Sequence, residues 1–264
     1  GMAAANTTVS QAGVADRVSE SRRSRAMALF PALSGLGWIL GPFFSSLLAQ
    51  IDYSAPFWIV AILFALLVPL CWWQVKRTVI ARKDKLQILR LFREIASVFR
   101  KTKVGLPFAI EAVTLIGWLM FQGFLATYHI ERYAFTTLIE GDAYAVAAIA
   151  WFLGGLSASG WLLHRHKART VLLPALFVAG LSVLCFIVFP HRALIWAFLS
   201  LAAYAQGLAT ACFVALFSEL VPTQMLGRIF VAWNGSLALA MVIGPILSGA
   251  LSGLWLDLPY LLAA

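Results

Sequence analysis

The sequence predicts an all-helical membrane protein that crosses the bilayer several times. Of its 264 residues, 62% are apolar and 12% are charged, and the mean hydropathy is +0.88. A soluble domain averages about 45–50% apolar and about 25% charged residues. The apolar residues gather in runs that approach or exceed the roughly 20 residues needed to span a bilayer. We expect spans at about residues 27–49, 57–75, 105–129, 142–163, 171–189, 193–218 and 229–254.

The loops between these runs alternate in positive charge. Eighteen Lys and Arg residues lie in one set of loops, 17–26, 76–104, 164–170 and 219–228. Two lie in the alternating set, 50–56, 130–141, 190–192 and 255–257. Cytoplasmic loops of membrane proteins are rich in Lys and Arg, so we expect a multi-pass protein of the cell (inner, cytoplasmic) membrane with the first set in the cytoplasm. The charge forms no continuous basic face of the kind that binds nucleic acid.

The longest loop divides the sequence into two hydrophobic blocks. In its second part, basic residues lie around one side of the expected helix. Five apolar residues lie on the opposite face: Ile88, Leu91, Phe92, Ile95 and Phe99. A basic amphipathic helix of this kind lies on the anionic inner leaflet; a solvated tether is the alternative. We therefore expect three parts, a first bundle at 1–75, a cytoplasmic linker at 76–104 and a second bundle at 105–264.

Two stretches of the chain repeat each other 203 residues apart. The first contains Asp16, Arg25 and Gly41-Pro42, and the second contains Glu219, Arg228 and Gly244-Pro245, with no gap between the matches. Proline removes a backbone donor from a helix, so its return at the same place indicates a repeated part with a function. Both copies have the same predicted orientation, as in transporters built from two parallel repeats.

Two motifs resemble those of a known family. The stretch GLGWILGPFFSS, with Gly37, Gly41 and Pro42, resembles the Gly-xxx-Gly-Pro-xx-Gly-Gly motif in the fifth helix of the major facilitator superfamily, which marks its drug/proton antiporters. Serines replace the last two glycines. The stretch GWLLHRHKAR resembles the superfamily's loop motif, with Gly160, Arg165 and Arg169 matching and a histidine in place of the acid.

The resemblance implies a major facilitator fold of two pseudo-symmetric helical bundles. It covers the chain from the family's helix 4 to the start of helix 12, so we expect an incomplete N-terminal bundle and a fragment of a longer protein. Residues 1–15 and 258–264 are then pieces of two further spans.

The Gly-Pro pairs are candidates for a gate. Proline bends a membrane helix, and glycines let another backbone approach closely. Gly37 and Gly41 lie four residues apart, a spacing repeated by Gly249 and Gly253. The resemblance implies that helix 5 seals against helix 8 and helix 11 against helix 2. A kink kept only for packing is the alternative.

Charged residues at helix ends are candidates for a cytoplasmic latch that holds one conformation. They are the pairs Asp16–Arg25 and Glu219–Arg228, together with the loop-motif residues Gly160, Arg165 and Arg169. Ordinary interfacial charge, worth about 0–1 kcal/mol per exposed pair, is the alternative.

Glu111 is the candidate for proton coupling. It lies eight residues beyond Lys103, about 12 Å into its span at 1.5 Å per residue, and we expect no other acid so deep in a complete span. A carboxyl group at that depth can carry a proton or meet a cationic substrate. Snorkelling to the interface, or an ion pair with a cytoplasmic Arg, is the alternative.

Polar and aromatic side chains inside the spans are candidates for substrate contact: Gln206, Asn6, Trp38, Trp118 and Trp151. Amides at that depth must find partners, either across helices or on a ligand. We expect Asn234, nearer the cytoplasm, to bond across helices. Aromatic walls suit bulky, planar or cationic solutes.

Enzyme and metal signatures are missing from the sequence. It contains no HExxH motif, P-loop or nucleophile elbow. The three cysteines lie in apolar runs as free thiols. We expect no enzyme activity, no metal and no cofactor, with a proton gradient as the energy source.

These features together predict a proton-coupled secondary transporter that works by alternating access. Its partners are a small-molecule substrate and the lipid bilayer, and we expect a monomer. The helix 5 motif favours efflux of a drug-like or antibiotic solute by proton antiport. A proton symporter that imports a metabolite, and a non-transporting sensor or assembly protein on the same scaffold, are the alternatives.

Overall fold

The computed structural model describes residues 37, 40–74, 97, 99–100, 103–189, 191–222 and 225–264. These residues form helices and no strands, and five of the helices are long and apolar enough to cross a membrane. The predicted all-helical, multi-pass fold is confirmed. The elements are the helix Leu40–Ala49, α3 (Ala55–Gln74), α5 (Gly105–Tyr133), α6 (Thr137–Ser157), the π-helix Ala158–Leu162, α7 (Leu163–Arg165), α8 (Ala168–Val188), α9 (Arg192–Leu220), α10 (Leu226–Ser252) and α11 (Leu258–Ala263).

A tight turn joins α5 to α6 where the sequence predicts a loop over 130–141. Ala134 ends α5 in the left-handed conformation, with φ of 49°. Two residues later the Thr136 side chain accepts a hydrogen bond from the Ile139 amide (3.4 Å) and caps α6. The predicted boundaries are wrong because the charged residues here, among them Glu140, belong to the helices themselves.

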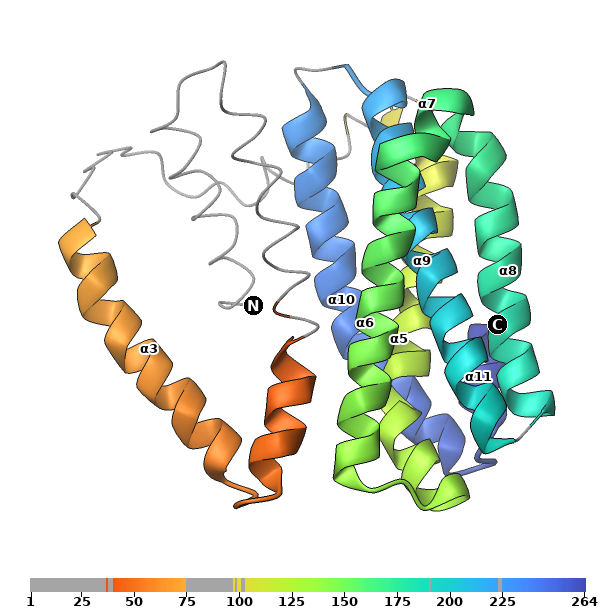
Figure 1. Cartoon of the computed structure of the whole chain (residues 1–264). Helices are drawn as coiled ribbons and strands as arrows, with labels where there is room; N and C mark the ends of the chain where they lie inside the picture. The colour runs from red at the N-terminus through yellow and green to blue at the C-terminus, as the bar shows by residue number, and fades with distance from the viewer. Residues whose placement is uncertain are drawn as a thin grey trace.

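The helices from α5 to α11 form a bundle. α9 packs along α6 on one side and along α8 on the other, while α5 packs along α10 (Figure 1). One buried apolar cluster surrounds Phe121, Tyr128 and Phe186. A second surrounds Phe213 and Phe217, towards the other ends of the helices. The bundle is thus filled at both ends by aromatic side chains.

Two glycines bring α6 and α9 close together. A Cβ atom on Gly154 would meet the carbonyl oxygen of Tyr204, and one on Gly207 would meet the carbonyl oxygen of Trp151. Small residues at helix crossings in membranes allow this close backbone approach. The crossing fixes α6 against α9 at the level of Trp151 and Gln206.

The two Gly-Pro motifs pack against successive helices. Near the first, Ser46 and the carbonyl of Pro42 lie against Gly141 of α6. In the second, Gly244 lies against the backbone of α5 at Leu119 and Met120. The buried Ser248 hydroxyl, in the position matching Ser45, donates to the Met120 carbonyl (2.9 Å). Both copies therefore meet the α5–α6 hairpin.

The paired glycines have no close neighbour among the described residues, and the predicted gate stays a prediction. No described atom lies within 4 Å of a Cβ built on Gly37, Gly41 or Gly249, and around Gly253 only atoms of its own helix do so. The close approaches occur instead at Gly141 of α6, against Ser46 and the Pro42 carbonyl, and at Gly244 of α10, against the backbone of α5 at Leu119 and Met120.

Several predicted features lie outside the described residues. They are Asn6, Asp16, Arg25, Trp38 and most of the linker, including the greater part of the predicted amphipathic helix. The division into 1–75, 76–104 and 105–264 stays a prediction. In Figure 1, α3 stands apart from the bundle, and its side chains from Phe57 to Val68 are exposed and all apolar.

Candidate functional site: a central cavity

A cavity of about 230 Å³ lies between α5, α6, α9 and α10. Its walls are largely aromatic and aliphatic, with a few polar groups. They are Pro42, Leu115, Trp118, Leu119, Gln122, Tyr144, Ala147, Ala148, Trp151, Gln206, Thr210, Trp233, Leu237 and Met241. An apolar cavity with few polar groups is the usual form of a small-molecule site.

Three of the predicted substrate residues meet in this cavity. Trp118 comes from α5, Trp151 from α6 and Gln206 from α9. Gln206 is 3% exposed, so its amide depends on neighbouring helices or on a ligand for hydrogen bonds. Pro42 of the Gly-Pro motif also lines the cavity. A role of these residues in binding stays a prediction.

Glu111 lies beside the cavity rather than in its wall. Its side chain is 1% exposed, and Oε1 accepts a hydrogen bond from Nε1 of Trp233 (3.1 Å). Among the described residues, Oε2 has no hydrogen-bond partner. Because Trp233 lines the cavity, one side chain connects the carboxyl group to the space where a solute fits. The alternative of snorkelling to the interface does not agree with this burial.

Several wall residues were not foreseen from the sequence. Gln122 lies one helical turn beyond Trp118, and its depth in the span was a usable signal of the kind that identified Gln206. Tyr144 donates its hydroxyl to the Gln122 carbonyl (3.2 Å). Nothing in the sequence marks Trp233 as the partner of Glu111, because that pairing depends on how α10 packs against α5.

The expected latch residues lie at the ends of the described helices. Glu219 is exposed near the end of α9, and Arg228 lies in the first turns of α10. Gly160 falls in the π-helix Ala158–Leu162. The guanidinium of Arg165 stacks over the ring of Trp161 at 5.2 Å, a cation–π contact. Arg169 is exposed near the start of α8, and the latch itself stays a prediction.

The expectation for Asn234 is wrong. Its side-chain amide donates to the Phe230 carbonyl (2.9 Å) four residues back in α10, and the residue is exposed. An amide can satisfy itself on its own helix in this way, so it needs no partner across the bundle.

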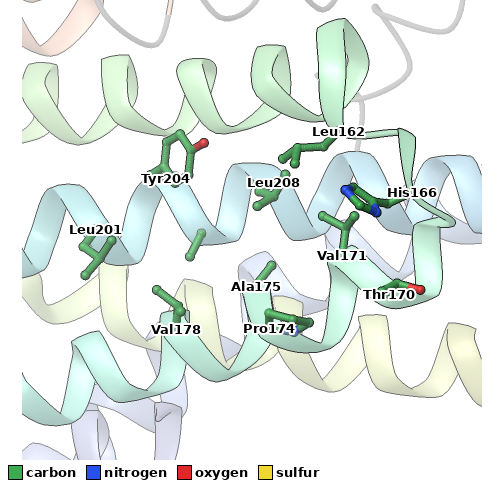
Figure 2. Close-up of a pocket in the computed structure, with 11 residues that line it drawn as sticks. Leu162, His166, Thr170, Val171, Pro174, Ala175, Val178, Leu201, Tyr204 and Leu208 are labelled. Atoms are coloured by element: carbon green, nitrogen blue, oxygen red, sulfur yellow. The ribbon is translucent and has the colours of Figure 1, made fainter. Parts of the chain in front are cut away.

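A second pocket lies between α8 and α9 and shares no residue with the cavity. Figure 2 shows the apolar side chains of Val178 and Leu201 towards one end, with His166 and Thr170 at the other. Its volume is about 500 Å³ and its walls are almost entirely apolar. Its lining contains Tyr204 but no tryptophan and no Asn or Gln side chain, so we take the central cavity as the candidate site.

The described residues contain no group of three or more His, Cys, Asp or Glu side chains placed to hold a metal ion. Cys212 is buried and Cys185 half-buried, and both are free thiols. The chemistry of the cavity is that of hydrogen bonding, aromatic contact and one nearby carboxyl group.

Several apolar helices long enough to cross a membrane, packed around an aromatic cavity, define a polytopic membrane protein. Residues 1–245 match the model of the Major Facilitator Superfamily, and the chain belongs to this family. It is therefore a transporter-family protein and not an enzyme, and its family binds small-molecule substrates in the membrane. The branch within the family stays a prediction.

A transporter structure is among the solved structures that are similar in fold. It is described as a bacterial homolog to the human lysosomal transporter Spinster in an inward-facing and unoccupied conformation, with a TM-score of 0.65 and 16% sequence identity. The match covers 95% of this chain and 64% of that structure, so this chain spans somewhat less than two thirds of its length. Comparison with the curated proteins gives no match.

Proposed function

We propose that this chain belongs to a proton-coupled secondary transporter that exports a small, aromatic or cationic drug-like solute in exchange for protons. The observation that carries the proposal is the buried carboxyl group of Glu111. It accepts a hydrogen bond from Trp233, and Trp233 lies in the wall of the cavity. Ionisable side chains inside membrane spans are rare and mark ion or substrate pathways. Trp233 both lines the cavity and donates to the Glu111 carboxyl group. The carboxyl group can therefore respond to whether a solute is present in the cavity.

The cavity chemistry supports an aromatic or cationic solute. Trp118, Trp151 and Trp233 come from three different helices. Their ring faces attract cations and stack on planar groups, and Gln206 offers an amide to orient the solute. Movement of α10 relative to α5 alters both the cavity and the Trp233–Glu111 hydrogen bond, which is the physical link that antiport requires.

The remaining expectations complete the proposal. The loops rich in Lys and Arg face the cytoplasm, so the protein lies in the cytoplasmic membrane with Glu111 on the inner side of the cavity. It functions as a monomer and uses the proton gradient without a further cofactor.

The test uses the full-length protein in inverted membrane vesicles energised to acidify the lumen. Ethidium and other aromatic cations are added, and a pH-sensitive dye reports proton release. The variant is Glu111→Gln, and the matched control is Glu131→Gln, an exposed acid on the same helix. We expect compound-dependent proton release in the wild type and the control and its loss in Glu111→Gln.

Other results would change the proposal in different ways. Release that survives Glu111→Gln keeps antiport but moves coupling to another residue. Acidification of the lumen, or a response only to polar metabolites, would favour symport. The absence of any solute movement across both panels would favour a protein that does not transport.

A further inference from the structure

A second buried carboxyl group lies at the other end of α5 from Glu111. His129 Nδ1 and Glu140 Oε2 are 2.7 Å apart across the α5–α6 turn. His129 is 0% exposed and Glu140 is 7% exposed. At that separation the two groups share a short, charge-assisted hydrogen bond. The sequence placed both in or next to a loop, and Glu140 lies in the first turn of α6 rather than deep in the span.

Both groups retain an unused polar atom. Nε2 of His129 and Oε1 of Glu140 are buried without a hydrogen-bond partner among the described residues. A contact that only held the turn together would need Nδ1 and Oε2 alone, whereas an unsatisfied buried polar atom is unfavourable and calls for an explanation. A proton on either free atom would change the charge of the pair by one unit.

Aromatic rings cover the His129–Glu140 pair on the side of the bundle where the α5–α6 turn lies. Phe135 in the turn lies 5.0 Å from the His129 ring, centroid to centroid, and stacks on Trp196 of α9. Phe186 of α8 lies 5.8 Å from His129 on another side. The pair is thus enclosed by three helices and the turn, close to one face of the bundle.

Some of the charged and titratable side chains near the pair have hydrogen-bond or ion-pair partners of their own, and others do not. Tyr128 donates its hydroxyl to Asp257 (2.8 Å), and Arg132 lies 3.6 Å from the same carboxylate. Arg192 of α9 donates to the Tyr133 carbonyl. The hydroxyls of Tyr133 and Tyr260 are buried without a partner in the described part of the chain. From α8, the apolar Phe186 belongs to the same buried cluster as Tyr128 and Tyr133.

The pair is connected to the cavity through α6. Glu140 and Tyr144 are four residues apart, which places their side chains next to each other on the helix surface. Tyr144 lines the cavity. Along α5, the cavity-lining residues fall between Glu111 and His129, which are separated by about 27 Å at 1.5 Å per residue. A carboxyl group therefore lies on each side of the cavity.

We propose that His129 and Glu140 form a second proton-binding site, on the external side of the cavity. The inference rests on the proposed proton coupling and identifies where the proton enters. With Nδ1–H donating to the carboxylate, the pair carries one negative charge and Nε2 is free. One proton taken from external water at Nε2 or Oε1 gives a neutral pair, and its return to water restores the charge, so atoms and charge balance.

This site gives the α5–α6 hairpin a coupling role. A change of one charge in a water-excluded place has a large effect on the free energy of burial. Protonation of the pair is therefore linked to whether the turn is closed over it. Tyr144 carries that change to the wall that a solute touches.

The first measurement does not depend on any solute. Infrared difference spectra of the full-length protein in lipid are recorded as the pH is stepped, for the wild type, Glu140→Gln and Glu131→Gln. We expect a carboxyl signal that titrates in the wild type and the exposed-acid control and is lost in Glu140→Gln. A spectrum of Glu140→Gln identical to that of the wild type would overturn the proposal.

The second measurement tests coupling in proteoliposomes with ethidium as the probe. The pH on the side of the α5–α6 turn is varied, and proton and ethidium movement are followed for Glu140→Gln, His129→Gln and Tyr128→Phe. The last variant removes a buried hydrogen bond in the same region without touching the pair. We expect both pair variants to bind ethidium and exchange it for unlabelled ethidium, but to lose proton movement. Tyr128→Phe should keep it.

Two outcomes would refute the second site. One is equal proton movement per ethidium in Glu140→Gln and the wild type. The other is loss of ethidium binding and of folding in both pair variants while Tyr128→Phe stays folded, which would make the pair a structural contact. A wild type that moves no protons with ethidium counts against the proposed function, and the infrared titration then decides the site alone.

Discussion

Replacement of Gly154 by Ala tests the crossing that fixes the cavity. Gly154 and Gly155 are neighbours on α6, but only Gly154 faces the backbone of α9 closely. Gly155→Ala is therefore a matched control on the same helix. The two variants add the same methyl group and gain the same helix propensity, about 1 kcal/mol, which cancels in their comparison.

The expected magnitude follows from the contact distances. A Cβ on Gly154 would lie 2.9 Å from the Leu208 amide nitrogen and 2.9 Å from the Tyr204 carbonyl carbon. Carbon atoms pack best at about 3.5–4.0 Å, and the Tyr204 carbonyl oxygen lies closer still to that Cβ. α6 and α9 must therefore separate by at least roughly 1 Å to make room for it. For Gly155 the nearest atom is the Gly207 oxygen at 3.9 Å, an ordinary contact. Overpacking of this kind destabilises by about 1–3 kcal/mol.

Thermal unfolding of the purified full-length protein measures the difference. We expect Gly154→Ala to melt at a lower temperature than Gly155→Ala. For soluble chains of this length, each kcal/mol of lost unfolding free energy lowers the melting temperature by about 2–4 °C. Because Trp151 and Gln206 border the same crossing, Gly154→Ala should also weaken ethidium binding more than the control does. Equal melting temperatures for the two variants would show that the close approach of α6 and α9 is not as we describe it.

Two further predictions concern hydrogen bonds. Ser248→Ala removes the hydroxyl that donates to the Met120 carbonyl across α5 and α10 and should lower stability by about 0.5–1.5 kcal/mol. Ser252→Ala, which loses an exposed contact within its own helix, should leave the melting temperature unchanged, and equal losses would contradict this. In the turn before α3, hydrogen bonds from the Ser54 amide and hydroxyl lower the pKa of Asp52. Ser54→Ala removes the hydroxyl but keeps the amide, so it should raise that pKa only part of the way towards its ordinary value in a carboxylate NMR titration. An unchanged pKa would show that the hydroxyl does not contribute.

The sequence was sufficient for the helices because the bilayer sets their length and composition. Apolar runs of about 20 residues have one stable arrangement in lipid, and α5, α6, α8, α9 and α10 follow them closely. Gln206, Trp118 and Trp151 could be selected in the same way, since polar and aromatic residues inside an apolar span stand out. Their meeting in one cavity depends on helix packing, which periodicity does not specify.

The sequence did not predict the helix boundaries correctly where charged residues lie in the last or first turn of a helix. Glu131, Arg132 and Glu140 give residues 130–141 the composition of a loop, yet the helices continue to Tyr133 and resume at Thr137. Glu140 therefore fell within a predicted loop, whereas its side chain is buried against His129. The glycines show a related limit, because Gly37 and Gly141 have the same chemistry and only Gly141 has a neighbouring helix against it among the described residues.

The α5–α6 hairpin combines the contacts and the chemistry of this protein. The Gly-Pro motif near Pro42 packs on α6 at Gly141, and its second copy packs on α5 at Met120. Between these contacts the hairpin supplies much of the cavity wall, with Glu111 near its start and Glu140 one residue before Gly141. A change in tilt at either proline therefore acts on the helix that carries a buried carboxyl group. We propose that a motif which weakens a helix occurs twice because each copy gives one neighbour of the hairpin a place to bend.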